Sequence, residues 1–288
     1  MPEARLLDAG GTRIAVREWG EPGGTSLLFW HALGPVASGA MLAEVAPRLA
    51  AAGYHIASVD GPGFGASPAL PPERYSLTSL VELALDVAGA LDFDRFVAMG
   101  HSWGGAIGVR LAGRAPDRVR ALVLIDSGHI DYRELPDVDA EISVQGWIEH
   151  ARARTMAWGS REAFESELRD GEKRLTPELL DAYLAGTRPE GTGLVGSSSE
   201  ARGAAMWGLL EPVSEAWPAV WERRIPTLLL LATEEPHAEQ NRQHLPRFLA
   251  AVPHADVRWM DGAGHGILSD VGPAAGDLIA LWLEEHRV

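Results

Sequence analysis

Short apolar runs alternate with longer amphipathic stretches toward both ends of the chain. Four continuous apolar runs are typical of strands buried on both faces, at residues 26–30, 56–59, 96–99 and 121–125, and two more strands are expected at residues 227–231 and 257–260. Helical patterns of hydrophobic residues accompany them, at residues 41–52, 77–91, 106–115 and around 274–285. This alternation predicts an α/β fold with a mostly parallel central sheet flanked by helices.

A hairpin is expected before the first of these units. Residues 13–19 follow the turn sequence Ala-Gly-Gly-Thr at 9–12, and another short run lies near residues 5–7. Two strand-like runs around a glycine turn indicate an antiparallel pair.

The pattern changes in the middle of the chain. Between residues 129 and 217 there is no convincing buried strand, only amphipathic stretches at 145–158, 160–170, 177–185 and 200–210. We therefore expect an α/β core of residues 1–128 and 217–288, with an all-helical cap inserted at residues 129–216. An insert of this kind lies at the carboxyl ends of the parallel strands, where open α/β sheets bind ligands.

Composition and charge exclude several classes of binding partner and of chemical site. The formal net charge is −15, which repels phosphate backbones, so no nucleic-acid partner is expected. The chain has no cysteine, which excludes disulfides, thiolate metal sites and a cysteine nucleophile. No apolar run has the length of a membrane helix and the first residues lack the apolar stretch of a secretory signal, so we expect a cytoplasmic protein. The oligomeric state stays open.

The clearest chemical signal is the sequence Gly-His-Ser-Trp-Gly at residues 100–104. It lies between the apolar run 96–99 and the helical pattern 106–115, the strand–turn–helix context in which a G-x-S-x-G serine is exposed. The flanking glycines permit the sharp turn, and the helix directs its positive end at a developing oxyanion. Ser102 is therefore the predicted nucleophile.

Four stretches of the chain resemble the α/β-hydrolase family, and the resemblance spans nearly everything outside the middle insert. They are residues 30–34 (Trp-His-Ala-Leu-Gly), residues 60–67 (Asp-Gly-Pro-Gly-Phe-Gly-Ala-Ser), the turn at Ser102, and residues 262–265 (Gly-Ala-Gly-His). This resemblance implies that the main-chain N–H groups of Leu33 and Trp103 form an oxyanion hole, although Ala32 replaces the family's usual glycine. His31 and the loop at 60–67 are expected to have structural roles.

His265 is the predicted general base. It follows the last apolar run in a glycine-rich turn, and glycines on both sides allow its imidazole to reach a serine hydroxyl. The order along the chain, with the nucleophile first and the base after the final strand, matches the family.

Two carboxylates compete for the third place in the triad. Most relatives carry an Asp in a Gly-x-x-Asp pattern after the strand that follows the cap, and here Glu235 occupies that position. Asp126 ends the run 121–125, where some relatives, certain dehalogenases and lactonases among them, carry the acid. We favour Asp126, because a short side chain on a rigid strand end orients an imidazole at a lower entropic cost.

These residues predict acyl transfer to water, with a small uncharged ester or lactone of apolar character as the substrate. Cleavage of a carbon–carbon or amide bond by the same triad is an alternative, and so is non-catalytic ligand binding on the same fold. A serine at position 102 argues against the epoxide hydrolase and haloalkane dehalogenase branches, whose nucleophile is a carboxylate. No phosphate-binding loop, dinucleotide motif or metal-binding cluster is present, so no cofactor and no metal are expected.

Aromatic residues concentrate in or beside the insert. They are expected to pack between cap and sheet, or to line an apolar pocket together with Met156 and Met206. These tryptophans are half of the 10 in the chain: Trp147, Trp158, Trp207, Trp217 and Trp221.

Overall fold

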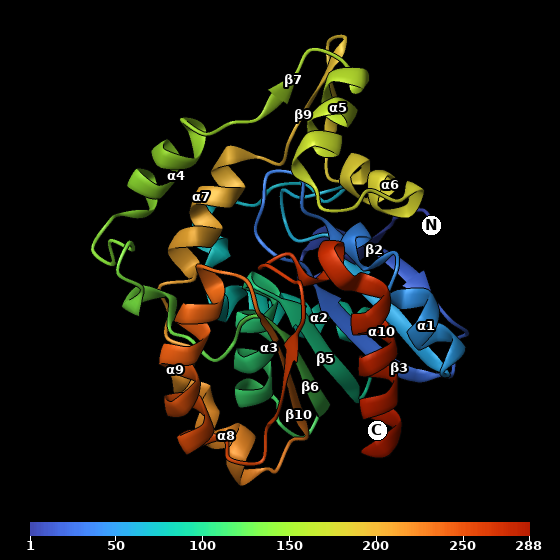
Figure 1. Ribbon diagram of the computed structural model, residues 1–288, viewed down its shortest axis with the longest axis vertical. Helices are drawn as coiled ribbons and strands as arrows, with labels where there is room; N and C mark the ends of the chain where they lie inside the picture. Colours follow the sequence, from blue (N-terminus) through green and yellow to red (C-terminus); the bar gives the residue numbers. More distant parts are fainter.

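The computed structural model describes residues 1–288 and is built around one eight-stranded sheet, in the order β1-β2-β4-β3-β5-β6-β10-β11 (Figure 1). β1 and β2 form an antiparallel hairpin, β2 pairs antiparallel with β4, and all other neighbours are parallel. The predicted hairpin and mostly parallel sheet are confirmed. The strands are β1 (Arg5–Ala9), β2 (Thr12–Trp19), β3 (Thr25–Trp30), β4 (Tyr54–Val59), β5 (Phe96–His101), β6 (Val119–Ile125), β10 (Thr227–Ala232) and β11 (Asp256–Met260).

Helices cover both faces of this sheet. Figure 1 shows α1 and α10 on one side of it, and α3, α8 and α9 on the other. None of the helices is long and apolar enough to span a membrane. The helices packed on the sheet are α1 (Ala46–Ala51), α2 (Leu77–Ala90), α3 (Trp103–Arg114), α8 (Trp217–Glu222), α9 (His237–Ala251) and α10 (Ile267–Glu285), with the 3-10 turns η1 (Gly39–Leu42), η2 (Pro72–Tyr75) and η4 (Ser214–Ala216).

The central strands are buried on both faces, which explains why they appear as continuous apolar runs. In β10, Leu228 and Leu230 belong to the hydrophobic core beneath α1 and α10, whereas Leu229 and Leu231 belong to the core beneath α2 and α3. Successive side chains of a strand point to opposite faces, so a strand covered on both must be apolar throughout.

Several helical regions differ from the sequence prediction, and α8 was not predicted. The pattern at 41–52 is divided into η1 and α1, with Pro47 in the first turn of α1. The closing helix begins at Ile267 and is kinked at Val271, because Pro273 lacks an N–H and crowds the preceding turn. α9 was not predicted at all, since only three of its residues are buried and its apolar period is weak.

The chain leaves the sheet between β6 and β10. Figure 1 shows α4–α7 of this segment together above one end of the sheet. Four helices there were predicted, but the pattern at 145–158 forms a helix only as far as Arg152. The expectation of an all-helical insert is wrong, because β7, β9 and β8 form a small antiparallel sheet. Strands of two or three residues are too short to show an alternating pattern. The elements are η3 (Tyr132–Glu134), α4 (Val144–Arg152), β7 (Ala157–Trp158), α5 (Arg161–Gly171), α6 (Pro177–Ala185), β8 (Arg188–Glu190), β9 (Gly193–Val195) and α7 (Ser199–Gly208).

We propose that residues 129–216 form a cap domain on a core of residues 1–128 and 217–288, since they contribute no strand to the main sheet. Two basic side chains between α5 and α6 attach this insert to the rest of the chain. Arg174 contacts both carboxylate oxygens of the buried Glu44, at 2.6 and 2.7 Å. Lys173 lies 3.2 Å from the Asp270 carboxylate, which accepts a hydrogen bond from the Gly264 N–H, beside His265.

Candidate active site

Ser102 lies at a sharp turn between β5 and α3. Its backbone has φ 54° and ψ −114°, a strained conformation for a residue with a side chain. The neighbouring glycines are required by close approach: a Cβ at Gly100 would lie 2.1 Å from the Gly104 carbonyl oxygen, and one at Gly104 would lie 1.9 Å from the Trp30 oxygen. The turn therefore holds the Ser102 hydroxyl above the carboxyl end of the sheet, at the start of α3.

Three of the predicted residues are brought together by the fold. Nε2 of His265 lies 2.9 Å from Oγ of Ser102, and Nδ1 of the same ring lies 2.7 Å from Oδ2 of Asp126. These contacts join β5, the turn after β11 and the end of β6. A hydroxyl, an imidazole and a carboxylate connected in this order are the arrangement used for activating a serine.

The Asp126 carboxylate is fixed by three further groups. Its Oδ1 accepts hydrogen bonds from the Ala232 N–H at 2.9 Å and from the Asn241 amide at 2.7 Å. His129 in turn contacts Oδ1 of Asn241 at 3.0 Å, which directs the amide NH2 toward Asp126. Burial alone would raise the pKa of Asp126, but the hydrogen bond and charge of His265, with the Ala232 and Asn241 bonds, hold it below its usual value.

Glu235 does not reach this group. Its carboxylate accepts hydrogen bonds from the Glu239 N–H at 2.9 Å and from Arg242 at 2.8 Å, so it stabilises the first turn of α9. The side chain is 56% exposed. The carboxylate that touches the imidazole is that of Asp126.

The main-chain donors named for an oxyanion hole are free. Neither the Leu33 nor the Trp103 N–H donates a hydrogen bond within the protein, and both residues line the same cavity as Ser102. His31 supports this segment: it is fully buried, with Nδ1 2.6 Å from the Ala32 oxygen and Nε2 accepting from the Gly61 N–H at 2.9 Å. The geometry gives His31 a structural position, away from the reacting hydroxyl.

Sequence reasoning missed three residues around the triad. His101 lies 2.7 Å through Nε2 from the His265 carbonyl oxygen and so tethers the turn that carries the imidazole. Asn241 and His129 hold Asp126 from behind, and Asn241 comes from α9, which had no helical signal. No local pattern marks these residues, because each acts through a contact more than 100 positions away in sequence.

The lowered pKa values of His101 and His129 predict how the free energy of unfolding depends on pH. Burial lowers the pKa of His101 to about 3 and that of His129 to about 4, from an ordinary value near 6.5. The native state keeps both rings neutral while the unfolded chain takes up protons, so the free energy of unfolding should fall as pH drops from about 6.5 toward 4. The expected slope is up to about 1.4 kcal/mol per pH unit for each histidine.

Urea unfolding at several pH values measures this slope, and His129→Gln should make it shallower. An unchanged slope in His129→Gln would show that His129 is protonated in the native state.

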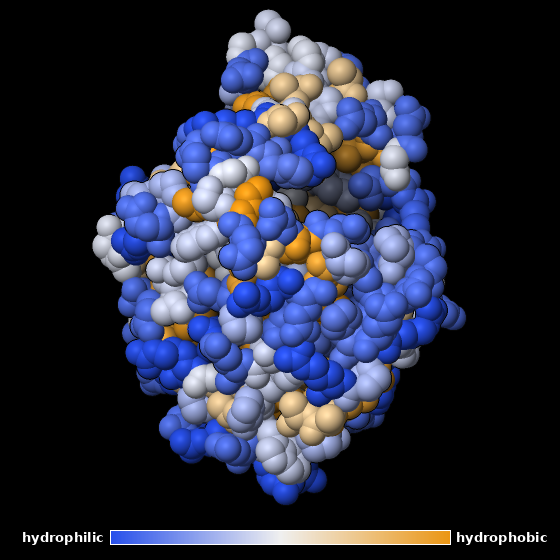
Figure 2. Space-filling view, turned by 90° about the vertical axis from the view of Figure 1, so that its left-hand side faces the viewer, coloured by the Kyte–Doolittle hydropathy of each residue, from blue (hydrophilic) through white to orange (hydrophobic).

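A cavity of about 250 Å³ opens beside Ser102. Half of its lining residues are hydrophobic, and the insert contributes Met206 and Leu209. Figure 2 shows hydrophobic residues in a hollow below the upper part of the molecule, on an otherwise mostly hydrophilic face. Met206 therefore lines the pocket, as one of the two sequence interpretations expected. Trp158 and Trp217 are instead buried in hydrophobic cores.

His237 also lines this cavity and brings a third ligand-type group near Asp126 and His265. Its ring stacks on that of His265, with centroids 4.6 Å apart and an interplanar angle of 20°. A metal binds an imidazole nitrogen in the plane of the ring, so two stacked rings cannot both direct lone pairs at one ion. Burial, followed by the charge of His265, lowers the pKa of His237. The three residues do not fit a metal site in this arrangement.

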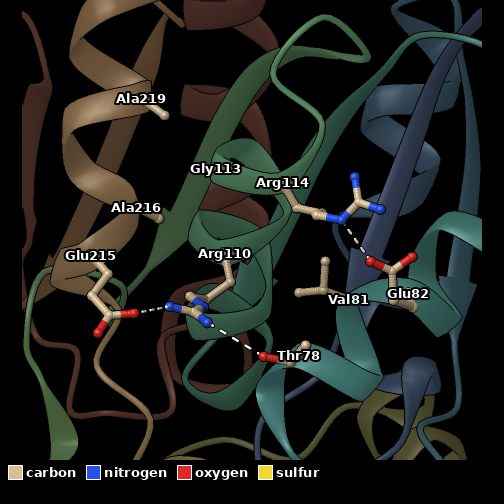
Figure 3. Close-up of a pocket in the computed structure, with 9 residues that line it drawn as sticks. All are labelled: Thr78, Val81, Glu82, Arg110, Gly113, Arg114, Glu215, Ala216 and Ala219. Carbon is tan, nitrogen blue, oxygen red and sulfur yellow. Dashed lines mark hydrogen bonds and ion pairs between the residues drawn. The ribbon is translucent and has the colours of Figure 1, made fainter.

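A separate hollow of about 300 Å³ lies between α2, α3 and η4, away from Ser102 (Figure 3). Its arginines are already paired: Arg110 contacts Glu215 at 2.8 Å and Arg114 contacts Glu82 at 2.7 Å. The hollow therefore offers no unpaired arginine to a ligand. The candidate reactive groups lie instead beside Ser102.

Comparison with known proteins gives a family match and partial matches to curated proteins. A family model described as alpha/beta hydrolase fold matches residues 25–270. Epoxide hydrolase A of Mycobacterium tuberculosis is 31% identical over 142 residues, which are 48% of this chain and 43% of that protein. 2-Hydroxymuconate semialdehyde hydrolase of a Pseudomonas species is 34% identical over 137 residues, 47% of each chain. The chain thus covers less than half the length of these curated relatives.

Solved structures match over nearly the whole chain. E-2-(Acetamidomethylene)succinate hydrolase superposes with a TM-score of 0.80 at 21% identity, covering 98% of this chain and 99% of that one. A thioesterase domain from the curacin biosynthetic pathway gives a TM-score of 0.75 at 23% identity, covering 97% and 99%. At these identities the likeness is one of fold.

Proposed function

The chain belongs to the alpha/beta hydrolase fold family, and on that premise we propose that it is a serine hydrolase that cleaves an ester or lactone through an acyl-enzyme. The observation that carries the proposal is the hydrogen-bonded series from Ser102 through His265 to Asp126, at 2.9 and 2.7 Å. Two unpaired main-chain N–H groups beside the serine add the electrostatic stabilisation that acyl transfer needs.

The proposed reaction has two halves. Oγ of Ser102 attacks the carbonyl carbon while Nε2 of His265 takes its proton, and the negative oxygen is stabilised by the Leu33 and Trp103 N–H groups. The C–O bond to the leaving alcohol then breaks, and His265 returns the proton to that alcohol. Water, deprotonated by His265, attacks the acyl-enzyme, and the acid is released as Ser102 regains its proton. Asp126 holds the imidazole in the tautomer with hydrogen on Nδ1 throughout.

The walls of the Ser102 cavity support an apolar group next to the bond that is cleaved. Met206, Leu209 and Ile130 line it and offer dispersion contacts rather than ion pairs. The similar proteins include an epoxide hydrolase and a semialdehyde hydrolase, so family membership leaves the bond open. Epoxide opening through an alkyl-enzyme needs a carboxylate nucleophile, which a serine hydroxyl cannot replace. Amide and carbon–carbon bonds remain alternatives that the same triad can serve.

A substrate panel with mass detection of the acyl-enzyme tests the proposal. p-Nitrophenyl esters of straight-chain acids and simple lactones should be hydrolysed, and a fluorophosphonate should label Ser102 stoichiometrically. Intact-mass measurement should show the acyl adduct under rapid quenching. Selective turnover of amides or of vinylogous 1,5-diketones, with esters inert, would favour one of the alternatives. Absence of both turnover and labelling would contradict a serine hydrolase.

A further inference from the structure

A second cavity, of about 430 Å³, adjoins the one beside Ser102. The two share Leu33, Tyr132 and Met206 in their walls, so a ligand bound at Ser102 can extend from one into the other. The second cavity lies between α4, α7 and the loop that carries Leu33. Its walls are more polar toward the insert, where His150, Arg154 and Arg202 line it.

Arg202 on α7 is a buried cation without a counter-charge. Its side chain donates to three backbone oxygens, those of Ser197 at 3.2 Å, Ala151 at 3.0 Å and Arg154 at 3.2 Å, and it forms no ion pair. The other buried arginine, Arg17, lies 2.8 Å from the Asp60 carboxylate. Backbone dipoles orient the Arg202 guanidinium but leave its unit charge uncompensated, and buried charges are normally paired.

Further unused donors line the same cavity. The indole N–H of Trp147 is buried and has no acceptor in the protein. Arg154 also lacks a carboxylate partner, and its side chain contacts only His150. The one acidic residue in the wall is Asp137. In a chain with a net charge of −15, this cavity has an excess of donors and of positive charge.

We propose that this cavity binds a carboxylate at the end of the substrate remote from the bond that is cleaved. The Nε–H of Arg202 is not donated within the protein, so it can donate a charge-assisted hydrogen bond to a carboxylate oxygen. The indole N–H of Trp147 can add a further bond. Met206 and Leu33 line the passage between the cavities and suit the methylene groups that connect the two ends.

This inference rests on the proposed function, and it modifies one sequence expectation. The part of the substrate next to Ser102 stays apolar, whereas its far end carries a negative charge. The substrate class is then the monoester of a dicarboxylic acid, or the ester of a hydroxy acid, depending on which side of the bond enters the insert.

Matched pairs of esters test the carboxylate site. On the acyl side, p-nitrophenyl hemiesters of dicarboxylic acids of about six to eight carbons are compared with p-nitrophenyl esters of monoacids of the same length. On the alcohol side, butyrate esters of ω-hydroxy acids are compared with butyrates of the plain alcohols. The wild-type kcat/KM should favour the anionic member of one pair by roughly 10- to 100-fold at low salt, the range expected for charge-assisted hydrogen bonds. The preference should shrink as ionic strength rises.

Substitutions assign that preference to the named residues. Arg202→Gln should bring the ratio of anionic to neutral kcat/KM close to one, and Arg154→Gln and Trp147→Phe should each lower it several-fold. Arg188→Gln, an exposed arginine of the insert outside the cavity, is the matched control and should keep the ratio. If Arg202→Gln fails to fold because the insert loses a tether, Arg154→Gln and Trp147→Phe still decide the question.

Binding without turnover gives an independent measurement. Calorimetry with the anionic member of each pair and Ser102→Ala protein should give, for one of them, a Kd about tenfold tighter than that of Ser102→Ala/Arg202→Gln. Equal kcat/KM for both members of each pair, or equal Kd values, would overturn the carboxylate site while ester turnover and fluorophosphonate labelling keep the serine hydrolase. Loss of labelling and of all ester turnover would instead refute the proposed function, and the calorimetric comparison would still judge the site.

Discussion

Replacing Ser102 by alanine is expected to lower kcat by roughly a million-fold and to abolish labelling by a fluorophosphonate. In a triad the nucleophile and base act as one unit, so loss of the hydroxyl removes the covalent route entirely. The residual rate should come from substrate binding and from the Leu33 and Trp103 N–H groups alone. The measurement is single-turnover hydrolysis of the best ester in the panel, with gel detection of the covalent probe.

Ser127→Ala is the matched control for this experiment. Ser127 lines the same cavity, and its hydroxyl has no hydrogen-bond partner, so the variant should still be labelled by the probe. Circular dichroism and the urea midpoint establish that both variants are folded. Labelling of Ser102→Ala at the wild-type rate would mean that another residue is the nucleophile.

Asp126→Asn is expected to reduce kcat by about three to four orders of magnitude while the fold is kept. An amide at this position can donate to Nδ1 of His265 and so favours the tautomer in which Nε2 carries the hydrogen, which cannot accept the Ser102 proton. The carboxylate site is already built for a negative charge, since Ala232 N–H and the Asn241 amide both donate to it. The loss should appear in kcat more than in KM, because Asp126 acts on the imidazole.

Glu235→Gln provides the comparison in the same assay. Its carboxylate is 56% exposed and pairs with Arg242, so the change should cost less than about threefold in kcat. A large loss in Glu235→Gln with near wild-type activity in Asp126→Asn would transfer the role of the acid to Glu235. Comparable losses in both would show that an open form of the loop lets Glu235 share the task.

The strands of the main sheet were predictable because consecutive residues in them are buried and therefore apolar. β3, β6 and β10 are covered on both faces and so contain unbroken apolar runs of four or five residues. α9 was not predictable, because only three of its residues are fully buried and one of them, Asn241, is polar, so its apolar residues leave a weak helical period. The small sheet of the insert was not predicted either, because its strands have only two or three residues and are mostly exposed or half-buried, so they show no alternation of apolar and polar residues.

Within the site, the sequence identified the residues whose role depends on their immediate neighbours in the chain. The turn at Ser102 needs glycines at 100 and 104 for close approach, and those glycines are visible in the sequence. The competition between Asp126 and Glu235 depended on three-dimensional reach, which a positional argument addressed only in part. Asn241 and His129 lay beyond prediction, because they contribute through contacts between segments that the chain brings together only when folded.

The adjacency of β6 and β10 has a consequence for how such a protein can change. Leu122 of β6 pairs with Thr227 of β10, so the chain departs from the sheet and returns to it at neighbouring strands. The entropic cost of closing the intervening loop grows only slowly with its length. The insert can therefore be lengthened, shortened or exchanged through crossovers at its two ends while the strand ends that carry Ser102 and Asp126 keep their pairing. If the proposed function is right, a chimaera that carries residues 129–216 of a relative should keep the Ser102 chemistry and change which substrates are turned over.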